Sequence, residues 1–292
     1  MKIAAIQMVS GPRVADNLAR ARRLLEQAAA AGAELAVLPE YFGFIGDDAP
    51  KLGVAEVWGD GPMQGFLAQA ARELGLWLVG GSLPLRTAVP GRATNTSLVF
   101  DPSGHVHARY DKLHLFRFDD GERRYDEAAT LDAGAQAVCF DLPSRDGHRW
   151  RVGLSICYDL RFPELYRAYA AAGCELFTAP SAFTALTGAA HWDLLTRTRA
   201  VENTCGLVAA AQGGTHENGR RTWGHSRVVD AWGSVLADAP AGEAVVCAEL
   251  EPAALAATRA RMASLAHRRD AQALRVVEAA VSLPPDSSSQ SV

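Results

Sequence analysis

Short apolar runs of strand length alternate with stretches of helical spacing in the first part of the chain. The runs at 3–8, 35–38, 76–79 and 96–100 are typical of buried strands. Between the first two, apolar residues recur at intervals of three and four and predict a helix: Leu18, Ala21, Leu24, Leu25 and Ala28. Asp16 or Asn17 can cap this helix, and Gly32 can end it. A second helix is predicted from Pro62 to Leu74, with Gly75 after its end.

The same order of elements returns in the second half. Residues 152–157 match 3–8, residues 171–181 match 30–40, residues 206–211 match 75–79, and residues 228–233 match 99–104. A helix is predicted from about His191 to Asn203. Because helices between strands imply parallel pairing, the pattern predicts two pseudo-repeated β-α-β-α-β-β halves whose sheets pack on each other. The expected fold class is α/β, a four-layer α-β-β-α sandwich that forms a single domain over residues 1–270.

Two chemically useful residues follow strands at corresponding places in this repeat. Glu40 comes after the strand predicted at 35–38, and Cys157 ends the strand predicted at 152–156. In open α/β sheets, chemistry gathers beyond the carboxyl ends of the strands. Glu40 and Cys157 are therefore expected at one rim of the molecule.

Two segments lie outside the repeat. Residues 117–132 are charged and loop-like, and they are a candidate lid over the site. Residues 271–292 are expected to form a C-terminal amphipathic helix followed by a disordered tail, since the last nine residues are mostly Pro and Ser.

Composition narrows the class of protein. With 49% apolar residues and a net charge of -4, the chain can fill a core and shows no signature of nucleic-acid binding. The five cysteines are odd in number, are widely spaced and include no C-x-x-C pair, which argues against disulfides and zinc and for a reducing compartment. The run at 3–8 is too short for a signal peptide, and no stretch is long enough to span a membrane. We expect a cytoplasmic protein.

Cys157 stands where an apolar strand stops and Pro163 opens a helix. A thiol there is presented at a sheet edge, beside backbone N–H groups that can stabilise a thiolate or an oxyanion. A buried packing cysteine is the ordinary alternative. The segment also resembles a serine nucleophile elbow, but Ser155 lies inside the strand and a cysteine replaces the last glycine.

Glu40 and Lys112 each have a structural alternative as well. Glu40 ends an apolar strand, where partial desolvation would raise its pKa and make it a useful base. A helix cap or an ion pair would explain it equally well. Lys112 follows the strand predicted at 106–110 and could be held inside, whereas a lone lysine there more often reaches the surface.

Three segments carry a resemblance to a known family. They are Leu38-Pro-Glu40-Tyr-Phe42, Tyr110-Asp-Lys112-Leu-His-Leu-Phe116 and Gly153-Leu-Ser-Ile-Cys157-Tyr-Asp-Leu-Arg161-Phe-Pro-Glu164. Together they resemble the signature segments of the nitrilase (carbon–nitrogen hydrolase) superfamily. Segments at 180–183, 187–192, 199–203 and 223–226 resemble its Nit branch, which contains ω-amidases and deaminated glutathione amidases. The family's fold is the four-layer sandwich, in agreement with the repeat.

The resemblance implies a role for each motif residue. Glu40 would be the general base, Lys112 the cation that stabilises the oxyanion, and Cys157 the nucleophile. The family's second glutamate best matches Glu127, with Asp126 and Glu122 close by as alternatives. Four further residues are expected to bind the substrate: Tyr158 through its backbone N–H, Arg161, Phe183 and His191.

The reaction that the resemblance implies is hydrolysis of a small amide carrying a free carboxylate, through a thioester. Deaminated glutathione or the ω-amide of a 2-oxo acid would be such a substrate, and no metal or organic cofactor is required. The family commonly forms dimers, so a homodimer or higher homo-oligomer is expected. The chain departs from the family's pattern in two places. It lacks a proline at 262–269, and it has Asn203-Thr-Cys205 in place of a Gln-containing segment. Both departures concern the substrate branch and the packing of the C-terminal region.

Other functions remain open from the sequence. A nitrilase would use the same three residues on a small nitrile, and an acyltransferase would pass the thioester to an amine. The membrane acyltransferases of this superfamily carry transmembrane helices, for which this chain shows no candidate. A non-catalytic interaction protein on the same scaffold would have no need to retain Glu40, Lys112 and Cys157.

The remaining candidates for catalytic, metal-binding or substrate-binding residues have structural explanations. His105 and His107 could suit a metal, but no third ligand has matching spacing, so a solvated strand face is favoured. A Cys–His dyad with His191 or His225 is set aside, since one opens a predicted helix and the other lies in a turn. Arg161 could bind a carboxylate together with the lid arginines Arg117, Arg123 and Arg124, but pairing with Glu164 is favoured. Cys139, Cys174, Cys205 and Cys247 are expected to be packing residues.

Overall fold

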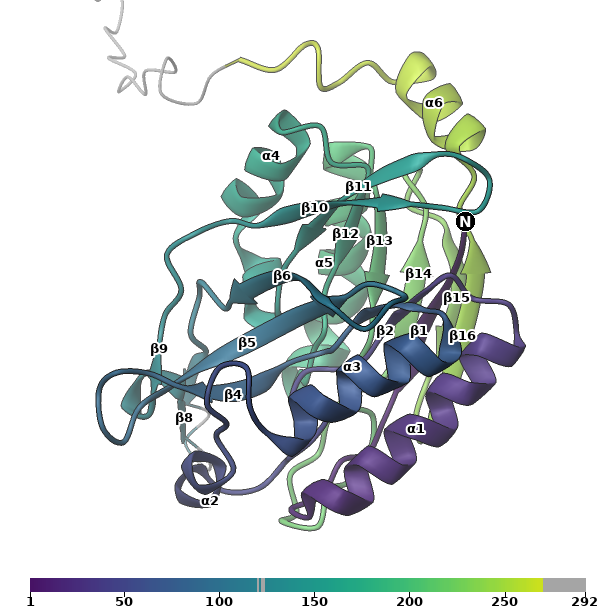
Figure 1. Ribbon diagram of the computed structural model, residues 1–292. Helices are drawn as coiled ribbons and strands as arrows, with labels where there is room; N and C mark the ends of the chain where they lie inside the picture. The colour runs from purple at the N-terminus through teal and green to yellow at the C-terminus, as the bar shows by residue number, and fades with distance from the viewer. Residues whose placement is uncertain (120, 122–123, 270–292) are drawn as a thin grey trace, which may run out of the picture.

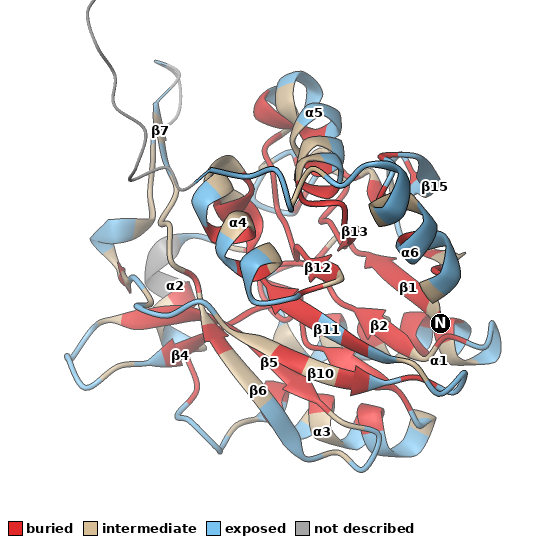
Figure 2. Ribbon diagram, turned by 90° about the horizontal axis from the view of Figure 1, so that it is seen from above, coloured by how far each residue is buried: buried red, intermediate tan, exposed pale blue. Residues whose placement is uncertain are grey.

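The computed structural model describes residues 1–119, 121 and 124–269. Two sheets stack in the middle of the molecule. The helices α1 (Val14–Ala30) and α3 (Pro62–Leu74) cover one outer side, and α4 (Pro163–Ala171) and α5 (Ala185–Asn203) cover the other (Figure 1). Figure 2 shows the same layers from above, with buried strands between helices whose outer faces are exposed. The predicted four-layer α-β-β-α sandwich is confirmed.

The first sheet has the strand order β16-β1-β2-β3-β5-β4, and β6 and β9 also pair with β5. Its strands are β1 (Lys2–Gln7), β2 (Leu35–Val37), β3 (Trp77–Val79), β4 (Leu83–Arg86), β5 (Ala93–Phe100), β6 (Val106–Asp111), β9 (Leu131–Asp132) and β16 (Ala244–Glu249). β1, β2 and β3 run parallel, with Ile3 opposite Leu35 and Leu35 opposite Trp77. Helices connect them, as parallel neighbours require.

The second sheet has the order β10-β11-β12-β13-β14-β15. Its strands are β10 (Cys139–Pro143), β11 (Arg149–Leu154), β12 (Leu176–Thr178), β13 (Gly206–Ala209), β14 (Ser226–Val229) and β15 (Val235–Ala239). β11, β12 and β13 are parallel, and α4 and α5 connect them, while β14 and β15 add antiparallel strands. This order repeats the arrangement of β1, β2, β3, β5 and β6, so the predicted duplication is confirmed.

Successive side chains of β1 pack into two different hydrophobic cores. Ile3 and Ala5 belong to the cluster that joins the two sheets, whereas Ala4 and Ile6 pack with the buried face of α1. All four are fully buried. A strand buried on both faces reads as a continuous apolar run, which is why the sequence pattern located it.

The boundaries of α3 agree with the prediction, and those of α1 do not. Gly75 ends α3 with φ of 63°, in the left-handed region that glycine adopts at low cost. α1 begins at Val14, so neither Asp16 nor Asn17 caps it. The buried Asn17 side chain instead donates to the carbonyls of Gly11 and Gly43, at 2.8 Å each. It thereby holds the loop after β1 against the loop that follows Glu40.

The prediction that α5 begins at His191 is wrong. The helix begins at Ala185, after Thr184, whose hydroxyl accepts a hydrogen bond from the Thr187 N–H at 3.2 Å. Its outer face carries exposed apolar side chains at Leu186, Leu194 and Val201. With apolar residues on more than one face, the helix lacks the single stripe from which a start is recognised.

The segment predicted as a lid contains a short hairpin, β7 (Arg117–Asp119) and β8 (Arg124–Asp126), followed by the 3-10 helix η1 (Glu127–Ala129). Two more helices lie outside the four layers, α2 (Asp48–Gly53) and α6 (Pro252–Arg261). Within the described residues, no helix has both the length and the apolar character needed to cross a membrane. The helix and tail predicted at 271–292 lie outside the described residues, as do Glu122 and Arg123.

Candidate active site

Cys157 lies at the tight turn between the end of β11 and the helix α4. It is the first residue of the 3-10 helix η2 (Cys157–Arg161), and its φ of 50° falls in the left-handed region. A non-glycine residue is uncommon there and is held by its surroundings, here by a hydrogen bond from its N–H to the Pro180 carbonyl at 2.9 Å. The turn places a nearly buried thiol, 8% exposed, at the rim predicted from the duplication.

Glu40 follows β2 at the same rim and is 2% exposed. One of its carboxylate oxygens, Oε1, accepts hydrogen bonds from the Asn95 side-chain amide at 2.9 Å and from Lys112 Nζ at 2.8 Å. The next residue, Tyr41, has φ of 55°, so the chain turns sharply directly after the carboxylate. These contacts exclude the helix-cap explanation and show Glu40 as a buried, paired acid.

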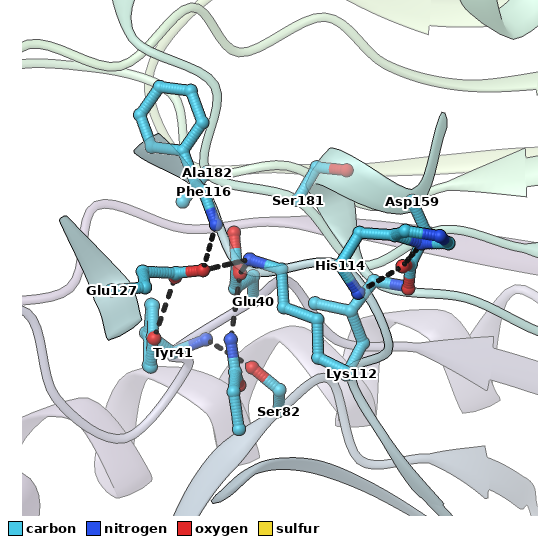
Figure 3. A network of polar contacts seen from close by, with 12 residues as sticks. Glu40, Tyr41, Ser82, Lys112, His114, Phe116, Glu127, Asp159, Ser181 and Ala182 are labelled. Carbon is cyan, nitrogen blue, oxygen red and sulfur yellow. Dashed lines mark hydrogen bonds and ion pairs between the residues drawn. The ribbon is translucent and has the colours of Figure 1, made fainter. Parts of the chain in front are cut away.

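Lys112 follows β6 and has a side chain that is only 1% exposed, so the surface-lysine alternative is wrong. Its ammonium donates to Glu40 and to both oxygens of Glu127, at 3.1 and 2.8 Å (Figure 3). Burial opposes the charged form, but the attraction of Glu127 and Glu40 outweighs it and raises the pKa of Lys112. The ammonium is therefore a fixed positive charge between two carboxylates.

Glu127, in η1, is the acid of the lid segment that reaches Lys112. It also accepts hydrogen bonds from the Phe116 N–H at 2.8 Å and from the Tyr41 hydroxyl at 3.1 Å. Burial alone would raise the pKa of Glu127, but Lys112 and the hydrogen bond from the Phe116 N–H lower it. Asp126 instead lies 3.8 and 3.5 Å from Arg117 and Arg124. Of the sequence alternatives, Glu127 is thus the described residue with the matching geometry.

Burial raises the pKa of the Cys157 thiol well above its ordinary value, and the negative charge of Glu40 raises it further. Lys112 and a hydrogen bond from the Ala182 N–H act in the opposite direction without reversing the shift. The resting sulfur is consequently a protonated thiol next to a carboxylate. It needs a base to remove its proton during attack.

A cavity of about 310 Å³ brings these groups together. Its lining includes seven residues expected from the sequence: Glu40, Lys112, Glu127, Cys157, Tyr158, Arg161 and Phe183. The other residues of its lining are Phe116, Ala182, Thr184, Thr187 and Arg220.

A family model for carbon–nitrogen hydrolases matches residues 2–260 of the chain. The chain belongs to the carbon–nitrogen hydrolase family. Deaminated glutathione amidase of Yersinia enterocolitica is 39% identical over 270 residues, which cover 91% of this chain and 92% of that protein. Omega-amidase NIT2 of Homo sapiens is 37% identical over 275 residues, which cover 92% and 95% respectively.

The chain is also similar to a solved structure. A mutant of the amidase from Nesterenkonia sp. AN1, which shows Michael addition of acrylamide at the active site cysteine, has a TM-score of 0.74 and 29% identity, and the match covers 90% of this chain and 98% of that chain.

The prediction that Arg161 pairs with Glu164 is wrong for this carbon–nitrogen hydrolase. The Arg161 guanidinium lies over the rings of Tyr158 and Phe183, at 5.7 and 5.6 Å, and Nη2 lies 3.2 Å from His191 Nδ1. Since Arg161 lines the cavity and no described carboxylate lies within 4.0 Å of it, the site keeps an unpaired cation. Among the described residues, this contact with Arg161 is what links His191 to the cavity.

The other histidine candidates from the sequence do not line the cavity. His225 Nδ1 lies 2.8 Å from Asp238, and the ring stacks on Trp223. Neither His191 nor His225 lines the cavity around Cys157. The ring of His107 makes an edge contact with Trp77, and no described His, Cys, Asp and Glu residues form a group of three that could hold a metal ion. All five cysteines are free thiols.

Sequence reasoning missed a buried carboxylate that joins the nucleophile turn to Lys112. Asp159 accepts hydrogen bonds from the Tyr110 hydroxyl at 2.6 Å and the Ile156 N–H at 2.9 Å. It also accepts one from the His114 N–H at 3.1 Å and lies 2.7 Å from His114 Nδ1 (Figure 3). Tyr110 and His114 flank Lys112 at two residues on either side. Tyr110 lies in β6 and His114 follows its end, so the alternate spacing of the two around Lys112 in the sequence was the available signal.

Proposed function

We propose that this carbon–nitrogen hydrolase is a thiol-dependent amidase whose substrate is a small amide bearing a free carboxylate. It converts the amide and water to an acid and ammonia or an amine. One observation carries the proposal: Glu40, Lys112 and Cys157, from three separate parts of the chain, line one small cavity. Burial of all three removes competing water contacts and strengthens their mutual electrostatic interactions.

The first step is attack of the Cys157 sulfur on the amide carbonyl. Because the resting thiol is protonated, Glu40 takes its proton as the carbon–sulfur bond forms. The oxyanion that develops is met by Lys112 and by the Tyr158 N–H, which lies at the start of η2 and has no acceptor among the described residues. Each such donor contributes about 3–4 kcal/mol of transition-state stabilisation.

Proton transfer and oxyanion binding are coupled through Lys112. In the resting site, the three N–H groups of its ammonium donate hydrogen bonds to Glu40 and Glu127. When Glu40 accepts the thiol proton it becomes neutral, and its attraction for the ammonium weakens. One N–H of Lys112 is then released at the moment the oxyanion forms, while Glu127 keeps the ammonium in place.

The second half of the reaction reverses these roles. Glu40 gives its proton to the departing nitrogen, the carbon–nitrogen bond breaks, and the acyl group remains on Cys157 as a thioester. Water then enters, Glu40 takes one of its protons, and hydroxide attack releases the acid and restores the thiol. The carboxylate of the substrate finds an unpaired cation in the same cavity, Arg161.

A panel of matched amides and nitriles tests this function. Ammonia or amine release should be seen with a 2-oxo-dicarboxylate monoamide or deaminated glutathione, and kcat/KM should be far lower for a neutral amide of equal size. The Cys157→Ala variant serves as the blank. Equal rates for the charged and neutral amides would contradict the proposed recognition of the carboxylate. Turnover of nitriles alone would show that the protein is a nitrilase and not an amidase.

We also propose a homodimer or higher homo-oligomer. Leu186, Leu194 and Val201 are 61%, 65% and 48% exposed and repeat at helical spacing along α5, so they form an apolar stripe on the outer face of this helix. A Leu194→Lys variant should shift the mass measured by analytical ultracentrifugation towards the monomer. A cytoplasmic location remains a prediction from the free cysteines.

A further inference from the structure

Asn95, in β5, is hydrogen-bonded to both Glu40 and Lys112. Its side-chain amide donates to Oε1 of Glu40 at 2.9 Å, and its backbone carbonyl accepts from the Lys112 N–H at 2.9 Å. The side chain is fully buried, and it does not line the cavity around Cys157. Asn95 therefore contacts two groups of the reaction centre without reaching the substrate.

The backbone of Asn95 is fixed from both edges of β5. Asn95 lies opposite Pro84 of β4, and the next residue, Thr96, lies opposite Asp111 of β6. All eight residues of β5 are buried. Glu40, by contrast, lies in the turn that follows β2. Because side chains on paired strands are held more precisely than those on loops, β5 gives the Glu40 carboxylate a fixed partner.

The other end of the Asn95 amide has no partner among the described residues. Its Oδ1 is buried and accepts no hydrogen bond from them. Since a carboxylate can only accept, the amide nitrogen must face Glu40, and this contact sets the orientation of the amide. A buried polar atom without a partner is unfavourable, and an apolar side chain of the same shape would avoid it. The contact with Glu40, and not the packing of the strand, therefore explains the amide.

Two donors occupy the same oxygen of Glu40. Asn95 Nδ2 and Lys112 Nζ both donate to Oε1, at 2.9 and 2.8 Å. A carboxylate oxygen has two lone pairs, so both of those on Oε1 are in use. A proton that Glu40 takes from the Cys157 thiol is therefore expected on the other oxygen, Oε2.

The two donors respond differently when Glu40 becomes neutral. The positive charge of Lys112 is attracted less strongly, so one of its N–H groups can turn to the oxyanion. The Asn95 amide carries no charge, and a protonated carboxyl still accepts a hydrogen bond at its carbonyl oxygen. That oxygen is Oε1 when the proton is on Oε2. Asn95 can therefore hold Glu40 during the steps in which Lys112 binds the oxyanion.

We propose that Asn95 is a positioning residue for the general base. The inference rests on the proposed amidase function and adds the group that keeps its base aligned. Asn95 holds Oε1 of Glu40, so that Oε2 takes the proton of the Cys157 thiol and gives it to the departing nitrogen. Oε2 then takes a proton from the incoming water and returns it to the sulfur when the acid leaves. Asn95 itself neither gains nor loses a proton in this cycle.

The test compares Asn95→Leu with Asn203→Leu. Asn203 is a matched control, because it is also fully buried, also has an unpaired Oδ1 among the described residues, and does not line the cavity. Its amide donates to the backbone carbonyl of Arg199 at 3.0 Å, and not to a catalytic group. The readouts are kcat and KM for a carboxylate-bearing amide, together with the unfolding temperature.

Asn95→Leu should lower kcat by on the order of 10-fold to 100-fold with KM little changed, since general acid–base catalysis contributes about 10²–10⁴-fold. Asn203→Leu should keep kcat close to the wild-type value, even if both variants lose the same unfolding temperature. Equal losses of kcat in the two variants, or a change confined to KM, would overturn the inference.

Asn95→Asp adds a readout that strand packing alone would not give. It keeps the shape of the side chain, but it can donate to Glu40 only while its own carboxyl carries a proton. The kcat of this variant relative to the wild type should therefore rise as the pH falls. The same ratio for Asn203→Leu should not change with pH. A ratio for Asn95→Asp that is independent of pH would contradict a role in holding Glu40.

A crystal structure keeps the test independent of turnover. Cys157→Ala alone should keep Oε1 of Glu40 within hydrogen-bond distance of Asn95, and adding Asn95→Leu should displace or turn the Glu40 carboxylate. An unmoved carboxylate in the double variant would overturn the assignment of Asn95. Failure of the wild type to hydrolyse any amide would instead contradict the proposed function, whatever the position of Glu40.

Discussion

The ammonium of Lys112 lies 2.8 Å from a carboxylate oxygen of Glu127, and the two side chains are 1% and 13% exposed. The residues are 15 positions apart, on either side of the β7–β8 hairpin. Through this ion pair the lid segment holds the ammonium of Lys112 at the place where the oxyanion develops, in addition to covering the cavity. A buried pair of this kind is costly to break from one side only.

Replacing Glu127 by Gln should lower kcat by on the order of 10²-fold, the loss typical of a displaced oxyanion donor. The amide keeps the shape but not the charge that holds the ammonium. Steady-state kinetics with a carboxylate-bearing amide gives the answer. Asp126→Asn is the matched control, since Asp126 is the neighbouring acid and pairs with exposed arginines. Equal losses of kcat in both variants would mean that the substitutions disturb the lid segment as a whole and not the contact between Glu127 and Lys112.

The same ion pair should be lost in acid. The pKa of Glu127 is lowered in the folded protein from its ordinary 4.5, so the unfolded chain binds the proton more readily. Its contribution to the free energy of unfolding is therefore fully present above about pH 4.5 and disappears as the pH falls through the lower, folded value. Urea unfolding of the wild type and Glu127→Gln should show a stability difference that shrinks in this direction. A difference independent of pH would argue against a charged pair.

The state of the thiol can be measured directly. Thiolate absorbance, taken as wild type minus Cys157→Ala, should titrate above pH 9.0, the ordinary value, because burial and Glu40 raise the pKa of Cys157. Glu40→Gln removes a negative charge and should move the midpoint down. A wild-type midpoint below neutrality would show a preformed thiolate and make a general base unnecessary.

Asp159 should matter for stability. Each of its oxygens takes donors from two groups, and an asparagine would turn its own N–H groups towards one of those pairs. Asp159→Asn should therefore lower the free energy of unfolding by about 2–5 kcal/mol, whereas Tyr110→Phe, which removes one hydroxyl, should cost about 1 kcal/mol. Urea titrations compare them. Similar small losses in both would show that the network does not join the turn to the strand as described.

The sequence predicted what depends on local pattern. The bounds of α3 follow from Pro62 and Gly75, and the duplication placed Glu40 and Cys157 at one rim because equivalent strands end at equivalent heights. The start of α5 was missed because apolar residues on its exposed face blur the helical stripe. The Asp159 contacts depend on which segments meet across the site. No spacing within one segment encodes such meetings.

The central claim is that Cys157 carries the acyl group of the substrate. Its most direct test is intact-protein and peptide mass spectrometry of enzyme quenched in acid during turnover of a carboxylate-bearing amide. The account predicts a mass increase equal to the acyl group minus one hydrogen, located on the peptide that contains Cys157, and none in Cys157→Ala. An enzyme that turns over with no adduct at any quench time, or a Cys157→Ala variant that retains substantial kcat, would contradict it.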